Sequence, residues 1–179
     1  MNKINQFKNI VPIGYVCDVT SFLIQVNKRS RAYIFDRFGT PMWAVTELMK
    51  NNFDEFMLRD NMKCEKLFES ETSPTILYDS KYYVRFPFKK LDENRFPHLV
   101  DSFHKRKDRF LDLLSLCNDE TDPILFIRSE EHDSYNDWGN RICIPEYEEK
   151  YKKDEYFHLI EFSKYIKTKY PSLPFKILF

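Results

Sequence analysis

The stretch Ile10-Val-Pro-Ile-Gly14-Tyr-Val-Cys17-Asp-Val-Thr-Ser-Phe-Leu-Ile-Gln-Val26 joins an apolar run, a glycine turn and an amphipathic pattern in immediate succession. Apolar residues recur at i, i+3, i+4 and i+7 from Val19 to Val26, which predicts a helix over residues 18–27. The run before Gly14 has the length of a short strand. Strand, tight turn and helix in this order are typical of an α/β domain.

The same stretch places Cys17 at the mouth of the predicted helix. Backbone N–H groups at a helix N-terminus have no intrahelical partner and carry a partial positive charge. This environment lowers the pKa of a thiol and favours the nucleophilic thiolate. The sequence therefore indicates a reactive Cys17, although a free cysteine is also commonly a small hydrophobic core residue.

Further apolar runs of strand length alternate with helical patterns. The expected strands cover residues 10–13, 32–35, 76–78 with 82–86, 124–127 and 175–179. The expected helices cover residues 18–27, 41–49, 52–57, 96–114 and 154–169, and the segments 59–74 and 129–153 show no regular pattern. This alternation predicts an α/β fold, with one domain over residues 1–179 and a mainly parallel sheet of about five strands with helices on both faces.

Composition limits the classes of partner. Lys plus Arg and Asp plus Glu both number 28, so the net charge is zero, and neither nucleic acid nor a membrane surface is an expected partner. No apolar run approaches the roughly 20 residues of a membrane span. The N-terminus lacks the apolar core of a signal peptide, and the four cysteines form no Cys-x-x-Cys pair. We expect a cytoplasmic protein, and the 17 Phe and 3 Gly fit the AT-rich genome of a low-GC bacterium or a large DNA virus.

Polar residues gather at the expected C-terminal ends of the strands, where parallel sheets bind their ligands. Three strand ends contribute, in chain order, Gly14 with Cys17, Asp36 with Arg37, and Arg128 with His132. A thiol, an imidazole and a carboxylate are the parts of a cysteine hydrolase. We therefore predict that Cys17 is the nucleophile, His132 the general base and Asp36 the carboxylate that orients the site.

The remaining residues of this set would bind substrate. The Gly14 turn would contribute to substrate binding. Arg37 and Arg128 would hold an anionic group of the substrate or stabilise developing negative charge. Neither a metal nor a cofactor is expected, because residues 130–133 supply only consecutive ligands and no glycine-rich phosphate loop is present.

Each of these residues also has a simpler interpretation. Asp36 could cap the following turn or pair with Arg37. His132 could belong to a solvated acidic loop, and Arg128 could pair with a nearby glutamate. The basic cluster at residues 105–109 is typical of a solvated helix face, with phosphate contacts as the alternative.

Several segments resemble a family of uncharacterised bacterial and large-DNA-virus proteins described as putative papain-like cysteine peptidases. The Gly-x-x-Cys turn of that family is matched by Gly14-Tyr-Val-Cys17, and its Phe-Asp-Trp element in part by Phe35-Asp36-Arg37. A basic helix with Arg-Phe-Leu is similar to residues 104–111, and a hydrophobic strand ending in arginine is similar to residues 124–128. The resemblance covers roughly residues 10–179 and implies a cysteine-centred site.

Two departures from the family pattern bear on function. The family carries a histidine in a Phe-x-His or Phe-Pro-His element, where this chain has Phe86-Pro87-Phe88, and Arg37 replaces the family tryptophan. The first hypothesis is hydrolysis or transfer of a peptide or acyl bond, with an unidentified peptide or small molecule as substrate. The alternatives are an inactive member that binds a protein partner, and a protein that binds a phosphorylated ligand through Arg37, Arg128 and the basic helix.

Overall fold

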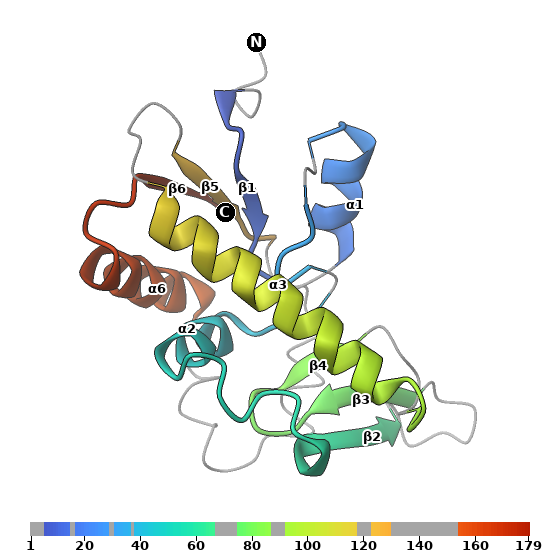
Figure 1. Ribbon diagram of the computed structural model, residues 1–179. Helices are drawn as coiled ribbons and strands as arrows, with labels where there is room; N and C mark the ends of the chain where they lie inside the picture. Colours follow the sequence, from blue (N-terminus) through green and yellow to red (C-terminus); the bar gives the residue numbers. More distant parts are fainter. Residues whose placement is uncertain are drawn as a thin grey trace.

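Two three-stranded sheets form the framework of the described part of the protein (Figure 1). The computed structural model describes residues 6–14, 17–28, 31–36, 38–66, 75–86, 92–117, 123–129 and 154–179. In these ranges the strands are β1 (Ile10–Pro12), β2 (Met62–Lys66), β3 (Thr75–Asp79), β4 (Val84–Phe86), β5 (Ile124–Ile127) and β6 (Phe175–Leu178). The helices there are α1 (Cys17–Gln25), α2 (Met42–Lys50), α3 (Phe96–Leu116) and α6 (Glu155–Lys169), with a 3₁₀ turn, η2, at Arg59–Asn61.

Sheet A is parallel and has the strand order β1-β5-β6. Ile10 pairs with Leu125, and Ile124 pairs with Phe175, so all three strands point the same way. All residues of β1 and β5 are buried, as continuous apolar runs in parallel sheets predict. The α/β class expected from the sequence is therefore confirmed.

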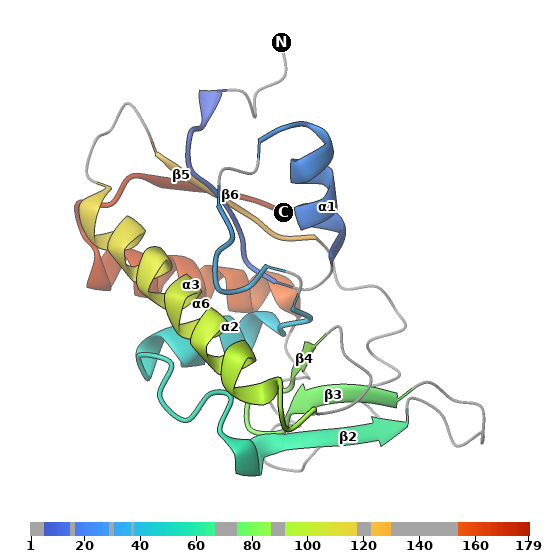
Figure 2. The same ribbon diagram turned by 45° about the vertical axis from the view of Figure 1, so that its right-hand side comes forward.

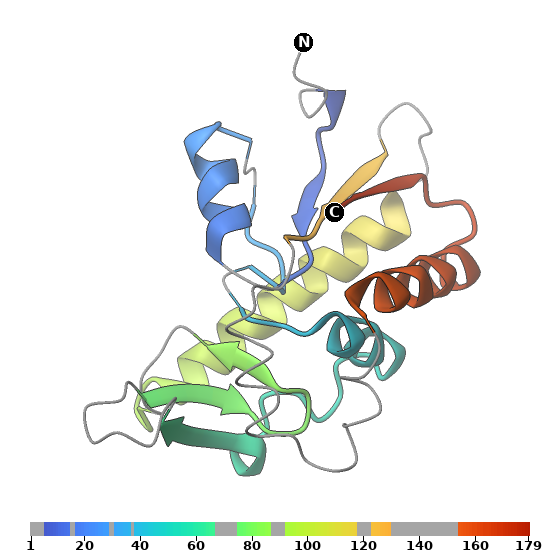
Figure 3. The same cartoon turned by 180° about the vertical axis from the view of Figure 1, so that it is seen from behind.

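Helices lie on both faces of sheet A (Figures 1 and 3). On one face, Val19 and Leu23 of α1 join a small apolar cluster with Ile10, Leu125 and Ile127. On the opposite face, α3 and α6 contribute to the main core, which contains the alternate sheet residues, among them Val11, Ile124 and Phe126. The helix that begins at Cys17 is thus separated from α3 and α6 by the sheet.

The prediction of one sheet with about five strands is wrong. Residues 76–78 and 82–86 belong instead to sheet B, which is antiparallel with the order β2-β3-β4. Only residues 80–83 join β3 to β4, and a parallel pair needs a crossover of a dozen residues or more. The sequence analysis missed β2 because its residues, Met-Lys-Cys-Glu-Lys, carry no apolar pattern.

Two further local predictions are also wrong. Residues 33–35 are buried as their apolar character suggests, but they form a turn, in which Asp36 N donates to Tyr33 O at 3.2 Å. Residues 52–57 form turns with positive φ at Asn52, Phe53, Glu55 and Met57, and not a helix. Their apolar spacing reflects burial of aromatic side chains in the core.

The other helices begin and end within three residues of their predicted bounds. Asp154 caps α6, because its Oδ1 accepts a hydrogen bond from Phe157 N at 2.7 Å. α3 runs from sheet B to sheet A (Figure 2). In the described ranges, no helix combines the length and the apolar character that crossing a membrane requires.

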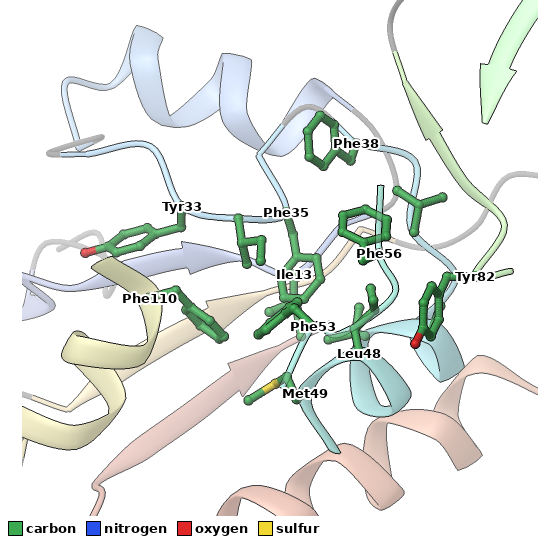
Figure 4. Packing of buried hydrophobic residues seen from close by; sticks show 14 of the residues in the cluster. Ile13, Tyr33, Phe35, Phe38, Leu48, Met49, Phe53, Phe56, Tyr82 and Phe110 are labelled. Atoms are coloured by element: carbon green, nitrogen blue, oxygen red, sulfur yellow. The ribbon is translucent and has the colours of Figure 1, made fainter. Parts of the chain in front are cut away.

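Aromatic rings connect the elements around α3 (Figure 4). Phe35 packs edge-on against Phe110 of α3 with ring centroids 5.8 Å apart, and Phe53 lies 6.1 Å from Phe35. Phe56 continues this packing towards sheet B through Phe86, at 6.1 Å. One hydrophobic cluster therefore contains residues of both sheets.

Candidate active site

The C-terminal edge of sheet A leads directly into α1. Ile13 N donates to Ile127 O at 2.9 Å, which extends the β1–β5 pairing by one residue. Gly14 follows with a φ of +84°, a conformation that side chains on L-residues disfavour. α1 then begins at Cys17. The backbone of Cys17 thus lies at a helix N-terminus, at the edge where parallel sheets bind ligands.

Gly14 lies between Arg128 and Thr40. A β-carbon at Gly14 would stand 2.9 Å from Arg128 Nη1, 2.9 Å from Thr40 Cβ and 3.0 Å from the Thr40 carbonyl oxygen. These distances leave room only for a hydrogen atom. The ends of β1 and β5 therefore bring Gly14 and Arg128 together, two residues that the sequence analysis placed at one edge.

The guanidinium of Arg128 is buried and held by acceptors of the protein itself. Its Nη1 donates to Ile13 O at 2.9 Å and to Thr40 O at 2.7 Å. Its Nε donates to Glu155 Oε1 at 2.6 Å, and Nη2 donates to the same oxygen. At least four of the five N–H groups of the guanidinium are thus engaged within the chain. These contacts favour an internal role for Arg128 over direct binding of an anionic ligand.

Two hydroxyl groups add to the polarity of this edge. Thr40 Oγ1 and Ser129 Oγ are buried and have no hydrogen-bond partner among the described residues. Thr40 contacts Gly14, and Ser129 follows Arg128 in sequence. Buried hydroxyl groups usually have a partner. This edge therefore offers hydrogen-bonding capacity that the described part of the chain does not use.

Asp36 lies in a turn and not at a strand end, because residues 32–35 form no strand. Its side chain is fully buried, and Oδ2 accepts a hydrogen bond from Tyr33 N at 3.3 Å. Burial raises the pKa of Tyr33, and the nearby Asp36 carboxylate contributes to the rise. Asp36 thus stabilises the turn that precedes it. The simpler interpretation from the sequence had Asp36 cap the turn that follows it.

Two arginines of the basic cluster on α3 contact residues 32, 36 and 38. Arg109 donates to Ala32 O from Nε at 3.3 Å and from Nη2 at 2.9 Å. Arg106 Nη1 lies 3.5 Å from Asp36 O, and its guanidinium stands 6.0 Å above the Phe38 ring. These contacts give both arginines a structural use and weaken the interpretation of the cluster as a phosphate site.

Replacing Arg109 with alanine should lower the free energy of unfolding by about 1–2 kcal/mol, because Ala32 O loses a charged donor. Lys105→Ala is the matched control on the same helix, since it removes only an exposed pair with Asp101 and should cost clearly less. Urea denaturation of both variants measures the difference. Equal losses would show that the contacts of Arg109 with Ala32 O do not stabilise the protein.

Two of the predicted site residues, Arg37 and His132, lie outside the described residues. Of the other histidines, His98 and His104 are exposed on α3, and His158 is half-buried on α6. No three side chains of His, Cys, Asp or Glu come together as a metal site in the described ranges.

Sequence reasoning missed Thr40 and Glu155 at this edge. Thr40 contributes through its backbone oxygen and its contact with Gly14, which residue type does not reveal. Glu155 follows an N-cap aspartate at the start of a predicted helix, where an acidic residue is explained by the helix dipole alone. Glu155 is identified as the partner of Arg128 only in the structure, where the start of α6 lies beside the end of β5.

The chain was compared with protein families, curated proteins and solved structures. A family model described as putative papain-like cysteine peptidase (DUF1796) matches residues 8–179. No curated protein and no solved structure is significantly similar to the chain. The matched range contains both sheets and every helix described above.

Proposed function

Since the chain belongs to the putative papain-like cysteine peptidase family, we propose that it is a thiol-dependent hydrolase with Cys17 as its nucleophile. The observation that carries this proposal is the position of Cys17 as the first residue of α1, after the Gly14 turn. A thiolate there gains stabilisation from unpaired backbone N–H groups and the helix dipole. Such a group can attack the carbonyl carbon of a peptide or acyl substrate.

The chemistry follows the general course of nucleophilic catalysis. The base takes the proton of the Cys17 thiol, and the sulfur forms a bond to the carbonyl carbon. The bond to the leaving group then breaks, and the leaving group takes that proton from the protonated base. Water then hydrolyses the resulting thioester and returns the free thiol. We assign the base to His132, the orienting carboxylate to Asp36, and stabilisation of developing negative charge to Arg37.

Arg128 and Gly14 have supporting roles in this proposal. Because four N–H groups of Arg128 are already engaged, its guanidinium is better suited to shape the site than to bind a substrate anion. Gly14 allows the backbone to approach Arg128 and Thr40 closely. The substrate is proposed only as a peptide or acyl compound, and no cofactor is needed for this reaction.

Iodoacetamide should alkylate Cys17 faster than any other cysteine at pH 7. Cys64 is exposed and Cys117 half-buried, so they are internal references for access alone. The pH dependence of alkylation should give Cys17 an apparent pKa well below about 8.5. Peptide mapping by mass spectrometry follows all four cysteines in one sample. A rate for Cys17 no higher than that of Cys64 would contradict the proposal.

The base assignment can be examined with the same readout. His132→Ala should raise the apparent pKa of the Cys17 thiol, because an imidazolium near a thiolate favours ionisation. His104→Ala, on the exposed face of α3, is the control. A change with His158→Ala and none with His132→Ala would reassign the base to α6.

The second candidate function is binding without catalysis, favoured by the lack of a histidine in Phe86-Pro87-Phe88. In that case the C-terminal edge of sheet A at Gly14 would bind a protein partner, and Cys17 would be unreactive. An unreactive Cys17 in the alkylation experiment would favour this function over hydrolysis.

A further inference from the structure

We propose that Arg128 and Glu155 are positioning residues that hold the Gly14 turn, and with it the start of α1, in the geometry that the Cys17 thiol requires. This inference rests on the proposed role of Cys17 as the nucleophile. It assigns a function to the buried ion pair that the sequence did not reveal.

The Arg128 side chain joins segments that are distant in sequence. It belongs to the end of β5 and donates to Ile13 O at the end of β1, 115 residues earlier. It also donates to Thr40 O, 88 residues earlier, just before α2. Glu155 adds the first residue of α6. One guanidinium therefore holds the residue before Gly14, the residue beside Gly14 and the start of a helix.

The guanidinium of Arg128 is itself firmly fixed. Arg128 N donates to Leu178 O of β6 at 2.9 Å, so its backbone continues the pairing of sheet A. The side chain of Arg128 is 0% exposed and that of Glu155 is 11% exposed. A planar guanidinium with several donors in fixed directions can serve these acceptors together, whereas a lysine ammonium cannot reproduce this geometry.

Glu155 binds Arg128 through one carboxylate oxygen. Oε1 accepts from both Nε and Nη2 of Arg128. The helix that carries Glu155 is anchored in turn, since Asp154 caps its first turn. Glutamine at position 155 keeps an oxygen for the same two hydrogen bonds, whereas alanine removes it. This difference separates the geometry of the pair from its charge.

Three roles for the pair predict different results. If it positions the turn, Arg128→Lys and Glu155→Ala should both disturb residues 10–20, and Glu155→Gln should resemble the wild type. If it acts through charge alone, Arg128→Lys should be silent, and Glu155→Gln should raise the reactivity of Cys17 by leaving a positive charge uncompensated. If the pair only stabilises the fold, hydrogen exchange should become faster to a similar extent in both sheets.

The test combines two measurements on the folded variants in buffer without denaturant. Hydrogen exchange followed by mass spectrometry reports the opening of residues 10–20, with β3 and β4 as the reference region. Iodoacetamide alkylation reports the thiol of Cys17, with Cys64 as the reference. We expect faster exchange in residues 10–20 and about tenfold slower alkylation of Cys17 in Arg128→Lys and Glu155→Ala.

The surface pair Arg59–Glu93 is the matched control. It joins the same residue types, but the two side chains are 53% and 64% exposed and lie by sheet B. Arg59→Lys and Glu93→Ala should leave both measurements unchanged. If Arg128→Lys does not fold, Glu155→Asp, which shortens the carboxylate arm by one methylene, replaces it and should show the same effects.

The outcomes separate this inference from the proposed function. Unchanged exchange in residues 10–20 of Arg128→Lys and Glu155→Ala would overturn the positioning role, whatever Cys17 does. Equal changes in residues 10–20 and in sheet B would overturn it as well. Slow alkylation of Cys17 in the wild type would instead refute the role of Cys17 as the nucleophile. Hydrogen exchange would still decide whether Arg128 and Glu155 hold the Gly14 turn.

Discussion

Gly14→Ala is expected to lower the free energy of unfolding by roughly 2–5 kcal/mol. Part of this loss, about 1–2 kcal/mol, comes from placing an L-residue at positive φ. The rest, about 1–3 kcal/mol, comes from inserting a methyl group 2.9 Å from both Arg128 Nη1 and Thr40 Cβ. Neither neighbour can withdraw easily, because Arg128 is buried and hydrogen-bonded and Thr40 is fully buried. Urea denaturation measures the loss.

Asn27→Ala is the control that separates backbone strain from crowding. Asn27 also has positive φ, at 52°, but it is exposed at the other end of α1. Alanine there should cost only the conformational part, about 1 kcal/mol. The excess loss in Gly14→Ala then measures the contact with Arg128 and Thr40. If Gly14→Ala loses no more free energy of unfolding than Asn27→Ala, the C-terminal edge of sheet A adapts to a side chain at position 14.

The parts of the fold that follow from local pattern could be predicted from the sequence. The α3 stripe and the fully apolar β5 are long or continuous enough to specify their own structure. Residues 32–35 and 52–57 have the same apolar character, but there it serves the aromatic core, where Phe35 and Phe53 lie 6.1 Å apart. Apolar spacing identifies burial, and long-range packing decides the backbone.

The candidate site was predictable to a similar extent. Gly14 and Arg128 could be placed at one edge, because they follow runs that form parallel strands. The partner of Arg128 could not be predicted, since no sequence rule connects the end of a strand to a helix start 27 residues later. The strand expected before Asp36 does not form for a related reason, because the turn at residues 33–36 depends on Arg109 and on core packing.

Asp79, at the end of β3, is the other buried group on which the fold depends. It is fully buried, and Oδ2 accepts a hydrogen bond from Met57 N at 2.9 Å. Oδ1 accepts from Lys81 N at 3.0 Å and from Tyr82 N at 3.2 Å. One carboxylate thereby holds the turn segment 52–57 against the β3–β4 hairpin. Residues with positive φ in that segment need this support.

Asp79→Ala is expected to lower the free energy of unfolding by about 3–5 kcal/mol at pH 7, because two buried N–H groups and a half-buried one lose their acceptor. Asp79→Asn should cost less, since its oxygen can still serve Lys81 and Tyr82 while its amide faces Met57 N. Asp92→Ala is the control, as Asp92 is an exposed carboxylate that accepts from Asn94 N and Arg95 N. Equal losses at the two aspartates would refute the role of Asp79.

Asp79 should also make stability depend on pH. Burial raises the pKa of its carboxyl from 3.8 to about 6. The folded state therefore binds the proton more tightly than the unfolded state, and this contribution, complete below pH 3.8, is lost as the pH rises through about 6. Between pH 5 and 7 the loss is about 1 kcal/mol. Urea denaturation at both pH values should show this loss in the wild type and not in Asp79→Asn, because asparagine does not titrate. The same pH slope in both proteins would mean that Asp79 stays ionised over this range.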